Sequence, residues 1–87
     1  MTSDKVLEVV SKYEHALGTH KARRFEGPRF PLKTEALEHI LWMCEEVRKF
    51  VTNQEMEKAM RWLGFIQGAL WVSGIYTIDS MRDDNRN

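Results

Sequence analysis

The residues best suited to chemistry lie in one short segment, HKARRFEGPRFPLK, at positions 20–33. This basic segment contains five Lys or Arg and one Glu, together with two Phe and two Pro. Arginine side chains engage phosphate oxygens in pairs, which lysine does less well, and aromatic rings stack on bases. Proline stiffens the segment and so lowers the cost of ordering it on binding. The composition favours a site for a small phosphorylated ligand, formed by Arg23, Arg24, Phe25, Arg29, Phe30 and Lys33.

Two other interpretations of the basic segment are open on the sequence. Residues 18–33 carry a net charge of +4 and residues 34–55 a net charge of −3. The arginines could therefore pair with Glu35, Glu38 or Glu45, or the segment could contact a partner protein. Duplex nucleic acid is a poor candidate, because the chain has 13 basic and 13 acidic residues and lacks the positive surplus of such binders.

Further candidates for the ligand site lie outside the basic segment. His39 is a candidate hydrogen-bond donor to a ligand, and otherwise a histidine at a helix surface or core edge. Trp42 and Trp62 are candidates for stacking on a base, although large aromatic side chains also fill cores and subunit interfaces. Arg61, next to Trp62, is suited to the mouth of a pocket.

The sequence offers no recognisable catalytic or metal-binding arrangement. His39 and Cys44 are five residues apart, or about 140° around a helix, and so do not form a catalytic dyad. The adjacent glutamates at 45–46 diverge by about 100°, and we expect Asp83 and Asp84 to be solvated. No CxxC, HExxH, Ser–His–Asp or phosphate-binding glycine pattern is present. We therefore predict a protein that is not an enzyme and that holds no metal or cofactor.

Helical periodicity predicts an all-α fold for these residues. Apolar residues recur at three- and four-residue spacing along three segments, and no alternating stretch is long enough for a sheet. A chain of 87 residues forms one domain, here a compact bundle of three main helices and a short C-terminal helix. The expected elements are helices at 4–17, 35–51, 54–73 and 78–84, with a loop at 18–33 after the first helix.

Polar residues and glycines indicate where these helices begin and end. Gly18 is expected to end the first helix in the left-handed conformation, and Gly74 to end the third. Residues 85–87 are expected to be a frayed tail. We expect helix starts at four capping positions, which are Thr2–Asp4, Thr34, the capping box Thr52–Glu55, and Thr77.

The chain is expected to form a homo-oligomer. A domain of this size buries only about 60–65 % of the surface of its unfolded chain, and a single cysteine excludes an internal disulfide. The helix at 54–73 is apolar nearly all round after Arg61, so it needs cover on several sides. Gly64 and Gly68 lie on one face of that helix and allow another backbone to approach closely.

The composition also predicts where the protein works. One thiol in a Met-rich chain is typical of a reducing, cytoplasmic setting. The sequence has neither the apolar run of a signal peptide nor the roughly 18 uncharged residues of a membrane span. We therefore expect no membrane partner.

Two runs, TEALEHILWMCEEV and EKAMRWLGFIQGALWVSGIYTIDSMRDDN, resemble a group of small proteins encoded by tailed bacteriophages. The resemblance spans residues 34–85 and is carried by LWMC and RWLGF-QG-LW. It implies a phage origin and a location in the host bacterial cytoplasm. The RW-L…-QG- pattern is also similar to phage anti-CBASS sponge proteins, which are helical oligomers that sequester cyclic nucleotide signals of bacterial immunity. The basic segment has no counterpart there, so this likeness assigns no binding residue.

These observations predict a phage anti-defence protein that binds a small (cyclic) nucleotide immune signal and does not cleave it. The alternative is a protein-interaction module that inhibits or redirects a host enzyme or regulator. A structural role in virion assembly is a third option.

Overall fold

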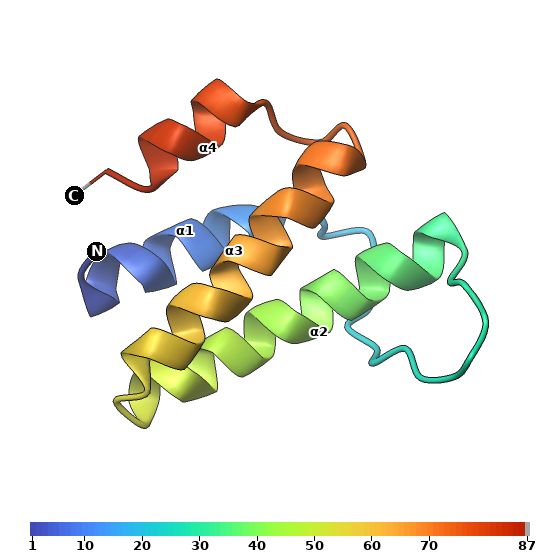
Figure 1. Cartoon of the computed structure of the whole chain (residues 1–87), viewed down its shortest axis with the longest axis horizontal. Helices are drawn as coiled ribbons and strands as arrows, with labels where there is room; N and C mark the ends of the chain where they lie inside the picture. The colour runs from blue at the N-terminus through green and yellow to red at the C-terminus, as the bar shows by residue number, and fades with distance from the viewer. Residues whose placement is uncertain (87) are drawn as a thin grey trace.

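The computed structural model describes residues 1–86, and this part of the chain contains four α-helices (Figure 1). No strand occurs within it, so the predicted all-α fold of three main helices and a short C-terminal helix is confirmed. The predicted tail residue Asn87 lies outside the described residues. The helices are α1 (Ser3–Ala16), α2 (Lys33–Thr52), α3 (Met56–Val72) and α4 (Ile78–Asp84).

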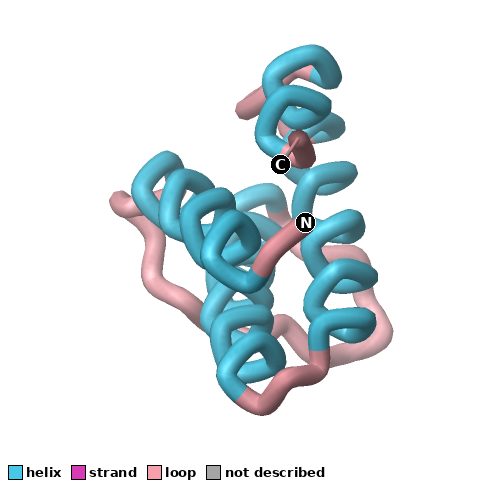
Figure 2. Tube along the Cα trace, turned by 90° about the vertical axis from the view of Figure 1, so that its left-hand side faces the viewer, coloured by secondary structure: helices cyan, strands magenta, loops and turns pink. Residues whose placement is uncertain are grey.

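The long helix α2 is the centre of the core, because both α1 and α3 pack against it (Figures 1 and 2). A short turn joins α2 to α3, and α4 lies near the other end of α3 (Figure 1). The buried stripes follow the predicted helical spacing. They consist of Val6, Val9, Val10 and Tyr13 on α1, of Leu37, Ile40, Met43, Cys44, Val47 and Val51 on α2, and of Ala59, Leu63, Ile66 and Leu70 on α3.

Three predicted boundary signals are confirmed. The Thr2 hydroxyl accepts a hydrogen bond from the Lys5 N–H at 3.2 Å and caps α1. Thr77 caps α4 in the same way, accepting from the Ser80 N–H at 3.1 Å. Gly74 follows α3 with a φ of 75°, the left-handed conformation that glycine adopts without strain. Each signal acts over a few residues, so the local sequence suffices.

The other three boundary predictions are wrong. Thr34 lies inside α2, which begins one residue earlier. The Thr52 hydroxyl donates to the Arg48 carbonyl oxygen at 3.0 Å, so Thr52 continues α2 and does not start a capping box. Gln54 then turns the chain with a φ of 62°, and α3 begins after Glu55. Gly18 is not among the glycines with positive φ.

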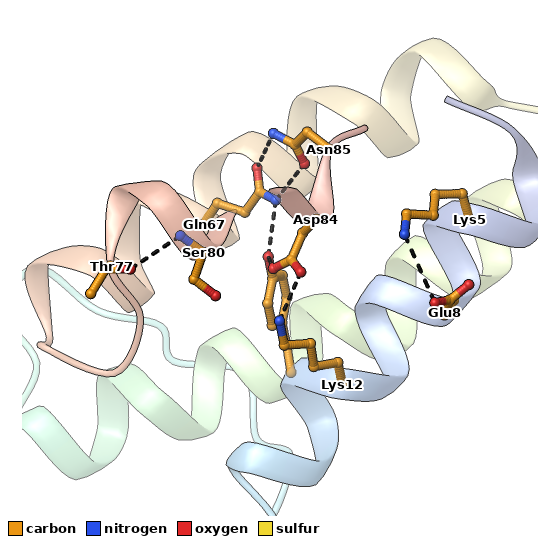
Figure 3. A network of polar contacts seen from close by, with 9 residues as sticks. Lys5, Glu8, Lys12, Gln67, Thr77, Ser80, Asp84 and Asn85 are labelled. Carbon is orange, nitrogen blue, oxygen red and sulfur yellow. Dashed lines mark hydrogen bonds and ion pairs between the residues drawn. The ribbon is translucent and has the colours of Figure 1, made fainter. Parts of the chain in front are cut away.

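A polar network fixes α4 to the bundle (Figure 3). The Asp84 carboxylate accepts hydrogen bonds from the Tyr13 hydroxyl at 2.8 Å and from the Lys12 ammonium at 2.7 Å. Gln67 on α3 donates to the Tyr13 hydroxyl at 3.0 Å. The Gln67 and Asn85 amides bond to each other at 2.7 and 3.2 Å. We call Lys12, Tyr13, Gln67, Asp84 and Asn85 the α4 network.

The α4 network corrects two expectations. Asp84 is not solvated, because its side chain is only 11 % exposed. Asn85 is not part of a frayed tail, because both polar atoms of its amide are bonded to Gln67. Asp83, in contrast, lies on the surface and pairs with Arg86 at 3.2 Å, as expected of a solvated carboxylate.

Candidate functional site

The basic segment precedes α2 in the chain and lies beside the first turns of that helix. Two hydrogen bonds attach it there. The Arg23 N–H donates to the carbonyl oxygen of Glu38 at 3.1 Å. The Phe25 N–H donates to Nδ1 of His39 at 3.0 Å. Burial lowers the pKa of His39, and the nearby Arg24 cation lowers it further, so the ring stays neutral and able to accept. His39 therefore positions the segment, a role that the sequence did not indicate.

Arg29 forms the strongest ion pair of the segment. Its guanidinium donates to both oxygens of Glu35, at 2.9 and 2.7 Å, and Glu35 also accepts from the Leu32 N–H at 2.9 Å. These contacts, the Arg29 bond above all, lower the pKa of Glu35 to about 2. The Arg29 guanidinium also lies 5.0 Å from the centre of the Phe25 ring. Pairing with the acidic helix, one of the two other interpretations of the segment, thus applies to Arg29.

Arg24 is held by a carboxylate and an aromatic ring. Its Nε lies 3.2 Å from Glu26, and its guanidinium carbon lies 5.3 Å from the centre of the Trp42 ring. Within residues 1–86, Arg23 and Lys33 form no ion pair. Two of the four predicted phosphate-binding cations of the segment are therefore free, and two are engaged by carboxylates.

An apolar cavity of about 230 Å³ lies between the basic segment, α2 and α3. Phe25 and Pro31 contribute the wall on the side of the segment, and Phe65 the wall on α3. The side chain of Phe65 is 62 % exposed, so the cavity opens at the surface. The full lining is Phe25, Pro31, Ala36, Leu37, His39, Ile40, Phe65, Ala69 and Ser73.

A second recess, of about 40 Å³, lies on the charged side of the same segment. It is lined by Arg23, Arg24 and Phe25 together with the carboxylates of Glu35 and Glu38. Its volume is less than a fifth of that of the apolar cavity. The arginines therefore do not converge on a space for a phosphate in this conformation, and two glutamates would repel one.

The predicted stacking residues are distributed between core and surface. His39, Trp42, Trp62 and Phe50 form a chain of tilted and edge-on ring contacts, with centroids 5.2, 5.8 and 4.9 Å apart. Trp42 and Trp62 are partly buried and pack against the core, as in the alternative interpretation in which they fill the core. Phe30 is 95 % exposed and lines none of the cavities described above.

Arg61 lies apart from the other cations, on the exposed face of α3. Its guanidinium is 3.7 Å from Glu57, one turn earlier. It lines neither the apolar cavity nor the charged recess.

Of the predicted site residues, the structure brings Phe25 and His39 together at the apolar cavity. Phe65 and Pro31 also line this cavity and were not predicted as site residues. The sequence signal for Phe65 was weak, because this residue lies off the buried stripe of α3.

The solvent-facing side of α3 is apolar from Gly64 to Val72, after the exposed ion pair of Glu57 and Arg61. Trp71 is 51 % exposed and Val72 is 78 % exposed, and both line a shallow depression with Phe65, Gly68 and Ala69. A Cβ added at Gly64 or Gly68 would meet no atom within 4 Å. The close approach predicted at these glycines is therefore not made by any other described element of this chain, and the face is open.

The comparisons with known proteins give no match: no protein-family model, no curated protein and no solved structure is similar to the chain. None of the helices in residues 1–86 combines the length and apolar character needed to cross a bilayer. In the same part of the chain, no three His, Cys, Asp or Glu side chains are grouped as a metal would require.

Proposed function

We propose that the protein binds a small nucleotide at the basic segment and releases it unchanged, as a phage protein that withholds a cyclic nucleotide signal in the bacterial cytoplasm. The apolar cavity carries this proposal, because Phe25 and Pro31 belong both to its wall and to the most basic part of the chain. A base would enter the cavity while its phosphates meet the cations outside. The cavity is smaller than the roughly 300–1,000 Å³ of pockets that enclose drug-sized ligands, so it suits one ring system.

Two groups of cations would bind the phosphates. Arg23 and Lys33 form no ion pair within the described residues and are available at once. Arg29 is available by exchange, because its partner Glu35 carries one negative charge at the surface and a phosphate group offers more charge and more acceptor oxygens. A guanidinium that exchanges a carboxylate for a phosphate keeps its paired hydrogen bonds, so the exchange needs little rearrangement.

A variant that fills the cavity tests the proposal without changing the charge. Ala36 lines the cavity at the start of α2, and Ala36→Leu places a larger side chain there while keeping a good helix former. We expect nucleotide affinity to fall at least tenfold, measured by calorimetry with a panel of cyclic and linear nucleotides. Ala16→Leu, at an exposed position at the end of α1, is the matched control. Equal binding by both variants would remove the cavity from the proposal.

A filtration experiment tests release without cleavage. The protein is incubated with the nucleotide panel, passed through a size filter and denatured, and the released material is analysed by chromatography. We expect an intact nucleotide, because His39 and Ser73 are the only lining residues that could act as base or nucleophile, no hydrogen bond joins them in the described residues, and Nδ1 of His39 already accepts from the Phe25 N–H. A cleaved product under multiple-turnover conditions would show that the protein is an enzyme.

The exposed apolar residues of the basic segment favour a second candidate, a module that binds a host enzyme or regulator. Phe30 and Leu32 flank Pro31 and are 95 % and 68 % exposed. Side chains of this size are typical anchors at protein interfaces. Capture of a single host protein that is lost in Phe30→Ala, together with no nucleotide release, would select this candidate.

A further inference from the structure

We propose that the apolar cavity selects a neutral, fused two-ring base that carries a ring acceptor, and that His39 donates the hydrogen bond to this acceptor. For the proposed function this means a purine rather than a pyrimidine nucleotide, and that consequence rests on the proposed function. The selection of the ring itself rests on the volume, the lining and the hydrogen bonds of the cavity.

The volume of the cavity favours two fused rings over one. A protein cavity of about 150 Å³ with aliphatic and aromatic walls binds benzene. The cavity beside the basic segment holds about 230 Å³ and opens at the surface, where Phe65 is exposed. A single six-membered ring would leave part of the apolar wall without contacts, which weakens binding. A fused two-ring system fills that additional space.

The walls favour a planar ring without charge. Aromatic side chains line the cavity from two elements, Phe25 from the basic segment and Phe65 from α3, and aromatic side chains pack favourably against further rings. None of the lining residues is Asp, Glu, Lys or Arg. A charged ring would lose its hydration there without gaining an opposite charge. The cavity therefore suits an uncharged ring whose phosphates remain outside.

The hydrogen bond from Phe25 determines which atom of His39 can meet a ligand. Nδ1 accepts from the Phe25 N–H at 3.0 Å, so a neutral ring carries its proton on Nε2. The adjacent Trp42 ring, with its centroid 5.2 Å away, offers no acceptor atom. No buried side-chain nitrogen in residues 1–86 lacks a partner, and Phe25 is the one hydrogen-bond partner of the His39 ring there, so Nε2 is accessible. His39 thus presents a free N–H donor.

A free donor in an apolar cavity selects a ligand with an acceptor. His39 and Ser73 are the only polar side chains of the lining. The Ser73 hydroxyl can donate or accept and so discriminates little, whereas Nε2–H can only donate. A ring nitrogen pairs this donor, and a ring of the same shape without that nitrogen leaves it unpaired. A neutral hydrogen bond of this kind changes an equilibrium constant by about two- to tenfold.

Two rings of equal shape test the selection without any phosphate. Benzimidazole and indole differ at one position, where benzimidazole has an acceptor nitrogen and indole has a C–H. Each is titrated into the wild-type protein at a pH where His39 and both rings are uncharged, and NMR shifts of the Phe25, Ala36 and Ala69 amides report binding at the cavity. We expect benzimidazole to bind about two- to tenfold more tightly than indole. Equal affinities, tighter binding of indole, or no shift of these amides would overturn the proposal.

A pair of variants assigns the selection to His39. The Asn side chain in His39→Asn can offer an oxygen in place of Nδ1, but it does not reach the position of Nε2. We expect the preference for benzimidazole to disappear in His39→Asn and to persist in His15→Asn, an exposed histidine on α1. If His39 only held the segment in place, His39→Asn would weaken both rings equally and leave the preference unchanged, and the assignment would be wrong.

Two measurements on the wild-type protein complete the test. A ¹⁵N spectrum of the His39 ring shows which nitrogen carries the proton, and a proton on Nδ1 would overturn the proposal. A panel of purine and pyrimidine nucleotides separates the two proposals. Binding of the rings without binding of any nucleotide would contradict the proposed function alone. Tighter binding of pyrimidine nucleotides would contradict the selection of a two-ring base and leave nucleotide binding intact.

Discussion

The α4 network allows a quantitative prediction for Asp84→Ala. The substitution removes the carboxylate that accepts from Tyr13, which is fully buried, and from Lys12. A hydrogen bond to a charged acceptor contributes about 1.5–3 kcal/mol to stability. The Lys12 contact adds at most about 1 kcal/mol, since its side chain is substantially exposed. We expect the free energy of unfolding to fall by about 2–3 kcal/mol, or roughly 10–20 °C in Tm for a domain of this size.

Two comparisons isolate the buried hydrogen bond from the loss of a charge. Asp83→Ala removes the neighbouring carboxylate, which has only a surface pair with Arg86, and should change stability by less than about 0.5 kcal/mol. In Tyr13→Phe the hydroxyl is already absent, so adding Asp84→Ala should cost about 1–2 kcal/mol less than in the wild type. All variants are measured by thermal and urea denaturation followed by circular dichroism. If Asp84→Ala were as mild as Asp83→Ala, the network would not stabilise the fold.

Three further predictions follow from the basic segment and α3. The folded-state pKa of His39 is lowered, so the hydrogen bond from the Phe25 N–H to its ring is fully present above the unfolded pKa of 6.5 and is lost as pH falls through the folded pKa. Below the folded pKa, the Phe25 amide proton should exchange faster with solvent, as measured by NMR. Glu35 should titrate near pH 2 in carboxyl NMR and return toward 4.5 in Arg29→Ala, and an unchanged titration would contradict the paired geometry. Gly64→Ala should raise monomer stability by about 0.5–1 kcal/mol in dilute denaturation experiments, since a Cβ there has no neighbour within the chain.

The parts of the fold that the sequence predicted depend on short-range signals. Apolar spacing located the helices and their buried faces, because it reflects one helix at a time. The caps at Thr2 and Thr77 each need only a side chain and an amide three residues later. The prediction of a capping box at Thr52 was wrong because a short-range signal is ambiguous there. A threonine hydroxyl can bond forward, as a cap, or back to the previous turn, and only the packing of α2 decides which occurs.

The parts that the sequence did not predict depend on residues that are distant along the chain. Tyr13 and Asp84 are 71 positions apart, and Tyr13 and Gln67 are 54 apart. No periodicity links such residues, so Asp84 was expected to be solvated like Asp83. The charge of the basic segment was evident from composition, but the partner of each arginine depends on the path of the loop. His39, which fixes that path, was predicted either to contact a ligand or to lie at a helix surface or core edge, and neither interpretation included its bond to the segment.

The three tryptophans lie in two separate environments, the contacting pair Trp42 and Trp62 and the exposed Trp71, which gives the protein its own optical reporters. Trp42 is in contact with Arg24 of the basic segment, Trp62 packs between Trp42 and Phe50, and Trp71 lies on the open face of α3. Ligand binding at the segment should therefore change the emission of Trp42, while any contact that covers the open face of α3 should shift that of Trp71 toward shorter wavelength. With single Trp→Phe substitutions, one fluorescence titration can separate the two events without any added label.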